Sequence, residues 1–250
     1  YYDYKEKYAS NPVLDLLRDK PHEHRVAGRL MPLRSDLPLT DNRAPFFAGI
    51  YESWLQQQFQ YYNVQSLDNV QMPRRPELDD VVLKTFMPTN SNQLPLVARL
   101  WQLTSTRYVI GLKPFVDTLV PQLDPTARQF SVRAAFNFVP RTTNRPAESL
   151  SLEEITTTIQ PDGQFALFEF TGALPRAHLF ARWQISTNDS ETMERLVDPA
   201  FDPTQSVLVA GPHPAPAPDT STNATAGTVA ITAYHPKQVA LKAEVTKPAV

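Results

Sequence analysis

Residues 164–186 read QFALFEFTGALPRAHLFARWQIS, and they predict two apolar strands separated by a break at residues 172–175. In the first strand both alternating sets of side chains are largely apolar, which is typical of a strand buried on both faces. After the break, residues 177–184 alternate apolar side chains with more polar ones, so we predict a second strand with one face nearer to water. We expect the rest of the chain to pack around this pair.

Further strands are predicted on both sides of this pair. The Asp162-Gly163 dipeptide predicts the turn that leads into the first apolar strand. The other predicted strands have either alternating apolar residues or many β-branched ones. They are residues 25–33, 107–110, 130–139, 152–159, 228–234 and 239–245, and the last two form a predicted hairpin around His-Pro-Lys-Gln.

The first half of the chain is predicted to be rich in helices. Asn11 followed by Pro12 is a typical helix start, with an asparagine cap and a proline at the first helical position. Residues 46–62 carry apolar side chains at spacings of three and four, opposite a run of glutamines, and predict an amphipathic helix. Its aromatic stripe, which includes Trp54, would suit a sugar ring, but this spacing is far more often core packing.

Together these elements predict an α+β fold, with mostly antiparallel sheets in the C-terminal half and short helices from the N-terminal half packed against them. We expect a helix-rich part with short strands at residues 1–125 and a β-rich part at residues 126–250, or one continuous domain. Asn188 and Glu191 have the spacing of a capping box and predict a short helix in the second part. Residues 211–227, rich in proline, alanine and threonine, predict an extended loop.

The composition excludes several classes of partner and chemistry. The formal net charge is −2 and no basic stripe is present, so nucleic acid is not an expected partner. Cysteine is absent, which excludes disulfides, thiolate metal sites and cysteine nucleophiles. No window offers the roughly 18 uncharged apolar residues that a membrane span requires. The chain begins without methionine or a signal-peptide pattern, and we interpret it as a segment of a longer protein.

Several segments carry a resemblance to a known family. They are RYVIG from residue 107, ALPRAHLFARW from residue 173, ERLVDPAFDP from residue 194 and SVLVAG from residue 206. Over residues 11–34 and 94–245 the chain resembles the extracytoplasmic domain of YfhO-like bacterial multi-pass membrane proteins, a glycosyltransferase-like family. A PGW motif that follows in this family is absent from the chain.

The resemblance implies a location on the extracytoplasmic face of a bacterial cell membrane and a role in decorating cell-surface polymers with sugars. The parent protein would be a lipid-linked glycosyltransferase whose chemistry takes place among its membrane helices. This segment would then be a non-catalytic module that binds an acceptor or a partner. The implied partners are the membrane-embedded remainder of its own chain and a surface glycan or lipid-linked sugar. No catalytic residue is carried over, and no cofactor or metal is expected.

Glu169 is the acidic residue with the most unusual setting, since it lies among phenylalanines in the first apolar strand. A carboxyl among apolar side chains has a raised pKa unless a cation pairs with it. Arg176, just past the break, is the predicted partner in a structural ion pair. Two alternatives stay open: a free-standing carbohydrate-active hydrolase that uses Glu169, and a glycan-binding module. The candidate binding residues are Trp54, Trp183 and Arg176.

Overall fold

The computed structural model describes residues 4–18, 22–28, 50, 54–67, 85–86, 88–125, 128–141, 154–211, 226–235 and 237–250. Its contacts divide the chain into two compact units, each built from two stretches. The first unit is Tyr1–Pro73 with Thr104–Ala173, and the second unit is Arg74–Leu103 with Leu174–Val250. This grouping differs from the expected boundary after residue 125, because strands from both sides of that position share one sheet. Helices and a mostly antiparallel sheet confirm the α+β class.

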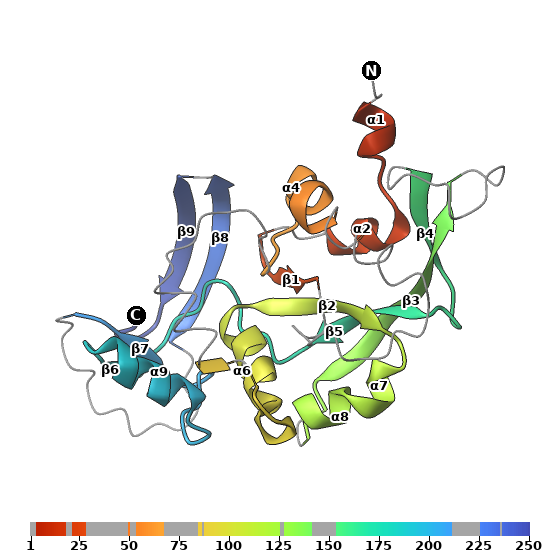
Figure 1. Ribbon diagram of the computed structural model, residues 1–250. Helices are drawn as coiled ribbons and strands as arrows, with labels where there is room; N and C mark the ends of the chain where they lie inside the picture. The colour runs from red at the N-terminus through yellow and green to blue at the C-terminus, as the bar shows by residue number, and fades with distance from the viewer. Residues whose placement is uncertain are drawn as a thin grey trace. The chain divides into compact units, whose positions relative to one another are not determined.

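A five-stranded sheet forms the centre of the first unit (Figure 1). Its order is β1-β2-β5-β3-β4, with β1 parallel to β2 and each other neighbouring pair antiparallel. Every strand overlaps a stretch that the sequence predicts as a strand, although residues 29–33 lie outside the described residues. The bounds are β1 Arg25–Ala27, β2 Thr106–Leu112, β3 Phe130–Pro140, β4 Ile155–Ile159 and β5 Phe165–Phe170.

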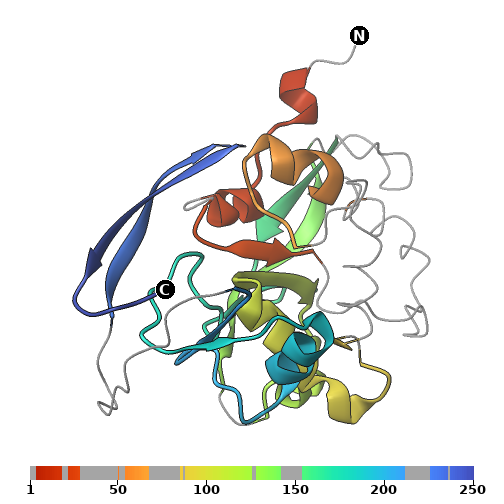
Figure 2. The same ribbon diagram turned by 90° about the vertical axis from the view of Figure 1, so that its left-hand side faces the viewer.

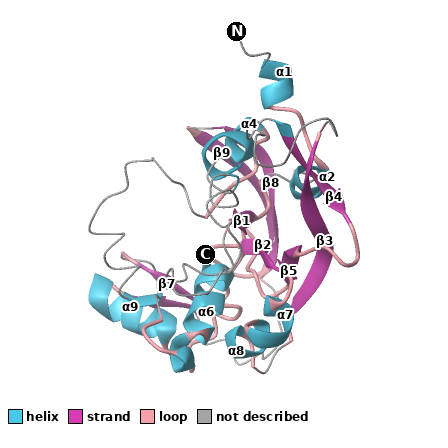
Figure 3. Cartoon of the chain, turned by 45° about the vertical axis from the view of Figure 1, so that its right-hand side comes forward, coloured by secondary structure: helices cyan, strands magenta, loops and turns pink. Residues whose placement is uncertain are grey.

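Short helices lie on both faces of this sheet (Figures 1 and 3). Helices α2 and α4 cover one face, and α7 and α8 lie on the other. Of the helix predicted at residues 46–62, only residue 50 and residues 54–62 are described, and there a π-helical turn leads directly into α4. The bounds are α1 Tyr4–Lys7, α2 Pro12–Leu17, the π-helical turn Trp54–Gln58, α4 Phe59–Tyr61, α7 Phe115–Thr118 and α8 Val120–Leu123.

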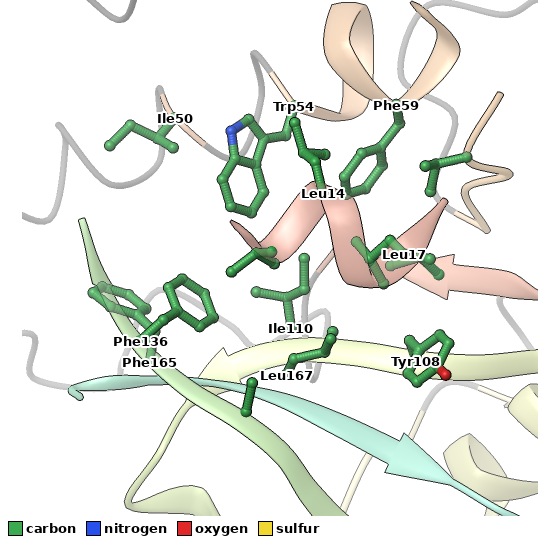
Figure 4. Close-up of a cluster of buried hydrophobic side chains, with 14 of the residues drawn as sticks. Leu14, Leu17, Ile50, Trp54, Phe59, Tyr108, Ile110, Phe136, Phe165 and Leu167 are labelled. Atoms are coloured by element: carbon green, nitrogen blue, oxygen red, sulfur yellow. The ribbon is translucent and has the colours of Figure 1, made fainter. Parts of the chain in front are cut away.

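Strand β5 is the central strand and is buried on both faces, as the sequence predicts. Residues 165–168 and Phe170 are buried, and only Glu169 is partly exposed. On the side of α2 its side chains join a core built from α2, the segment around Trp54 and the sheet (Figure 4). The labelled members of this core are Leu14, Leu17, Ile50, Trp54, Phe59, Tyr108, Ile110, Phe136, Phe165 and Leu167.

The prediction of a strand at residues 177–184 is wrong. Only its end forms a strand, β6 Trp183–Ile185, and β6 pairs with β7 Val207–Val209 rather than with β5. The physical reason is that β5 already has β2 along one edge and β3 along the other, so neither edge remains for the segment that follows it. Phe180 instead exchanges two backbone hydrogen bonds with Val250, at 2.8 and 2.9 Å.

The second unit combines helices with two small sheets. Strands β6 and β7 are parallel and are connected through α9, whose cap is Asn188, as predicted; the cap oxygen accepts from the Glu191 N–H at 3.2 Å. Strands β8 and β9 form the predicted hairpin (Figure 2). Residues 212–225 of the predicted loop lie outside the described residues. The remaining bounds are the 3₁₀ turn Ser91–Gln93, α6 Pro95–Leu103, α9 Asp189–Val197, β8 Gly227–His235 and β9 Gln238–Val245.

Arg99 connects α6 to the segment that follows α9 through side-chain hydrogen bonds. Its Nη2 donates to the carbonyl oxygen of Phe201 at 2.8 Å and to that of Asp198 at 3.3 Å, while Nη1 donates to Oε1 of Gln102 at 3.0 Å. Burial lowers the pKa of the Arg99 guanidinium, and the charges of Asp202 and Asp198 act in the opposite direction. The contact joins the two chain segments that make up the second unit.

Candidate functional site

All three tryptophans, including the two considered as binding residues, are buried. Trp54 exposes 5% of its surface, Trp183 exposes 8% and Trp101 exposes 2%. The Trp54 ring lies 6.2 Å from that of Phe59 and 6.4 Å from that of Phe136, so it is part of the core of the first unit. The glycan-binding alternative therefore loses the aromatic residues on which it was first based.

Glu169 pairs with Arg107 instead of the predicted Arg176. Its Oε1 accepts from Nη2 of Arg107 at 2.6 Å and from Nε at 2.9 Å. The register brings the two residues close together, because Tyr108 of β2 lies opposite Glu169 and Arg107 directly precedes Tyr108. Arg176 lies in the second unit, with Nη2 at 3.4 Å from the hydroxyl of Tyr234 and its guanidinium carbon 5.8 Å from the centre of that ring.

Two of the histidines that the structure describes, His24 and His178, take part in packing. The ring of His24 is buried and meets that of Tyr108 edge-on, with 4.8 Å between centroids. His178 lies in the same way against Phe180, at 4.5 Å. Among the described residues, no group of three or more histidine, cysteine, aspartate or glutamate side chains is placed to hold a metal ion. Nor does any helix in those ranges have the length and apolar character needed to cross a membrane.

A partly exposed group of aromatic rings brings residue 8 together with the end of α4. We call Tyr8, Tyr61 and Tyr62, together with Arg18, the tyrosine cluster. The rings of Tyr8 and Tyr61 stack, with centroids 4.5 Å apart and planes inclined by 14°. Tyr62 meets Tyr61 edge-on, at 5.1 Å and 87°. Tyr61 is 52% exposed while Tyr8 and Tyr62 are partly buried, so Tyr61 is the member that solvent or a ligand reaches.

The end of α4 fixes the positions of two of these tyrosines. Asn63 follows the helix in the left-handed conformation, with φ of 56°. The Val64 N–H donates to the carbonyl of Phe59 at 2.8 Å, and the Asn63 N–H donates to that of Gln60 at 3.2 Å. These two bonds form a Schellman motif, which ends a helix and satisfies its last carbonyls. Because Phe59 and Val64 are both buried, the core holds the helix end that carries the cluster.

Polar contacts surround the rings of the tyrosine cluster. The guanidinium carbon of Arg18 lies 5.2 Å from the centre of the Tyr62 ring, within the range of a cation–π contact. The same arginine places Nη2 at 2.7 Å from Oδ1 of Asp15. The Tyr62 hydroxyl donates to the backbone carbonyl of Tyr8, which joins the start of the chain to α4. The site therefore combines the exposed ring of Tyr61 with the neighbouring ring of Tyr62, which carries the ion pair of Arg18 and Asp15 beside it.

Sequence reasoning missed this cluster. It assigned Tyr62 to a core stripe, which is confirmed, because the partly buried Tyr62 packs against the core of the first unit. It gave no role to Tyr8 or Tyr61. A signal was present in the adjacent pair Tyr61-Tyr62, because neighbouring residues on a helix point about 100° apart, so that a ring beside one that faces the core is turned toward solvent. Tyr8 had no such signal, since its contact with Tyr61 depends on how distant segments fold together.

No protein-family model matches the chain, and neither the curated proteins nor the solved structures contain a match to it. The resemblance to YfhO-like proteins thus depends on the sequence segments alone. What the tyrosine cluster can bind follows from its own geometry.

Proposed function

We propose that the chain is a non-catalytic glycan-binding module of a bacterial cell-envelope protein, and that it holds a sugar-containing acceptor for the membrane-embedded part of that protein. The observation that carries the proposal is the stack of Tyr8 on Tyr61, a residue that is 52% exposed. The sequence resemblance supports the same setting, because it implies a role in the glycosylation of surface polymers.

The tyrosine cluster has the chemistry that a sugar ring requires. A tyrosine presents an apolar ring face together with a polar hydroxyl, which matches the apolar face and the hydroxyl rim of a pyranose. One face of Tyr61 is already supported by Tyr8, so little side-chain freedom is left to lose on binding. Arg18 and Asp15 add a charged donor and a charged acceptor for sugar hydroxyls.

The hydrolase alternative receives less support. A glycosidase requires two carboxyl groups about 5 to 10 Å apart across the scissile bond. The Oε1 atom of Glu169 accepts from two nitrogens of Arg107, so this carboxylate is committed to an ion pair between neighbouring strands. The proposal therefore gives Glu169 a structural role.

Replacing Tyr61 with alanine is expected to weaken glycan binding about fivefold, because loss of a stacked aromatic contact costs on the order of 1 kcal/mol. Binding is measured by titrating the chain with chitohexaose, maltohexaose and purified bacterial cell-wall polysaccharide while the tyrosine resonances are followed by NMR. The Tyr61→Phe variant keeps the stacked ring and should retain most of the affinity.

The matched control for Tyr61→Ala is Ile159→Ala. Ile159 is 46% exposed on β4 and belongs to no aromatic cluster, so its truncation should leave the affinity unchanged. If none of the three glycans binds, or if Tyr61→Ala binds as tightly as the original chain, the glycan-binding proposal is wrong.

The envelope setting makes a separate prediction about location. In the native bacterium, the full-length gene product should sediment with the membrane fraction, and protease added to intact cells should degrade this segment. The measurement is immunoblotting with an antibody raised against the chain, with a cytosolic protein as the control for cell lysis. Detection only in the protease-protected cytosolic fraction would contradict the envelope setting, and the titrations would still decide glycan binding independently.

A further inference from the structure

One edge of the β8–β9 hairpin carries backbone groups that pair with no other described strand. In the part of the chain that the structure describes, β9 pairs with β8 and no strand lies along its second edge. The Thr246 N–H donates to the carbonyl of Ala226, just before β8, at 2.9 Å, so the backbone groups of Thr246 are directed toward the β8 side. Inward and outward backbone groups alternate along an antiparallel strand. It follows that Leu241, Ala243 and Val245 turn their N–H and C=O groups away from β8.

We propose that this edge of β9 pairs with the same edge of a second copy of the chain. The two strands would run antiparallel about a two-fold axis at Ala243, and the two hairpins would form one four-stranded sheet. A two-fold axis places each residue opposite the residue equally far on the other side of it. Leu241 then lies opposite Val245 of the second copy, and Lys242 lies opposite Glu244 of the second copy.

Charge complementarity is the argument for a second copy as the occupant. The side chains of Lys242 and Glu244 are 73% and 75% exposed, and they bear opposite charges on either side of the proposed axis. Pairing about Ala243 therefore creates two Lys–Glu contacts and no contact between like charges. These residues occupy the closely spaced pairs of the new ladder, because their own backbone groups bond to β8. Lys242 and Glu244 also contact each other within one strand, at 3.7 Å. This ion pair is too exposed to compete strongly with the contacts between the two copies.

Apolar side chains favour the same register. Leu241 is 57% exposed and Val245 is 55% exposed, and the proposed pairing sets each against the other across the two copies. Cross-strand apolar pairs of this kind stabilise a sheet. A two-stranded ribbon alone is marginally stable, and an open edge is a template for a further strand. Pairing thus extends the hairpin to a four-stranded sheet and places Leu241 and Val245 beside apolar side chains of the second copy.

The test is sedimentation equilibrium of the chain over a series of concentrations. The original chain should form dimers in a concentration-dependent way. Lys242→Glu should raise the dissociation constant of the dimer about tenfold or more, because it sets two glutamates opposite each other at both symmetric positions. Glu244→Lys should do the same with two lysines, whereas the double variant Lys242→Glu/Glu244→Lys should restore the dimer.

A matched control is Lys237→Glu, which makes the same change of charge in the turn, outside the paired residues, and should leave the dimer unchanged. Ala243→Pro removes an outward N–H without removing a bond to β8, so it should abolish the dimer while the hairpin amides of β8 stay protected from hydrogen exchange. A chain that is monomeric at every concentration, or a dimer that the double variant fails to restore after both single changes weaken it, would overturn the proposal.

Discussion

Replacing Asn11 with alanine is expected to lower the free energy of unfolding of the first unit by about 2 to 3 kcal/mol. The Asn11 side chain is 4% exposed, and its Oδ1 accepts from the N–H groups of Val13 and Leu14 at 3.1 and 3.0 Å. The same oxygen accepts from the hydroxyl of Thr157 on β4 at 3.1 Å. Alanine would remove the cap of α2 and leave the buried hydroxyl of Thr157 without this acceptor. The two costs add because the backbone N–H groups of α2 and the hydroxyl of Thr157 are separate donors, and each loses its acceptor.

This loss is measured by urea unfolding followed by circular dichroism, together with hydrogen exchange of the Val13 and Leu14 amides. The matched control is Asn188→Ala, which removes the cap of α9. That cap is exposed and accepts from one backbone N–H, so its loss should cost less than about 1 kcal/mol. Asn11→Asp keeps an acceptor oxygen and should retain most of the stability. If Asn11→Ala costs no more than Asn188→Ala, the contact with Thr157 does not stabilise the fold as argued.

The features that sequence predicted correctly depend on neighbours in the chain. Asn11 and Asn188 were recognised as caps because a cap acts on backbone N–H groups two or three residues away. The two-sided burial of β5 was visible because a strand with apolar residues on both faces must be covered on both. The hairpin β8–β9 was predicted because its two strands are neighbours in the chain, joined by a short turn.

The features that sequence missed depend on contacts between distant segments. Residues 177–184 have a strand pattern, yet whether they form a strand is decided by the occupied edges of β5. Arg107 reaches Glu169 through the register of β2 with β5, whereas Arg176 was nearer only along the chain. The stack of Tyr8 on Tyr61 likewise joins segments more than fifty residues apart. A local pattern indicates which secondary structure a residue prefers, whereas its contacts with distant residues depend on the whole fold.

Replacing Phe136 with alanine is expected to have the largest effect, a loss of about 4 kcal/mol in the free energy of unfolding, which is a large share of the usual stability of a domain. Phe136 is 0% exposed, and its ring lies 5.5 Å from that of Phe138, 5.7 Å from that of Phe165 and 6.4 Å from that of Trp54. It also sits between β4 and β5 in the sheet register. Its removal would therefore open a cavity at the centre of the core.

The cavity left by Phe136→Ala should persist because the backbone around it has little room to close. A Cβ atom at Gly163 would lie only 2.4 Å from the Phe136 nitrogen, so the turn before β5 already packs directly against this part of β3. The cost of a large-to-small change rises when neighbours cannot collapse into the space. Val132→Ala on the same strand is the control, since Val132 is 38% exposed and should cost less than about 1 kcal/mol. Equal losses for the two variants in urea unfolding would contradict the placement of Phe136 at the centre of the core.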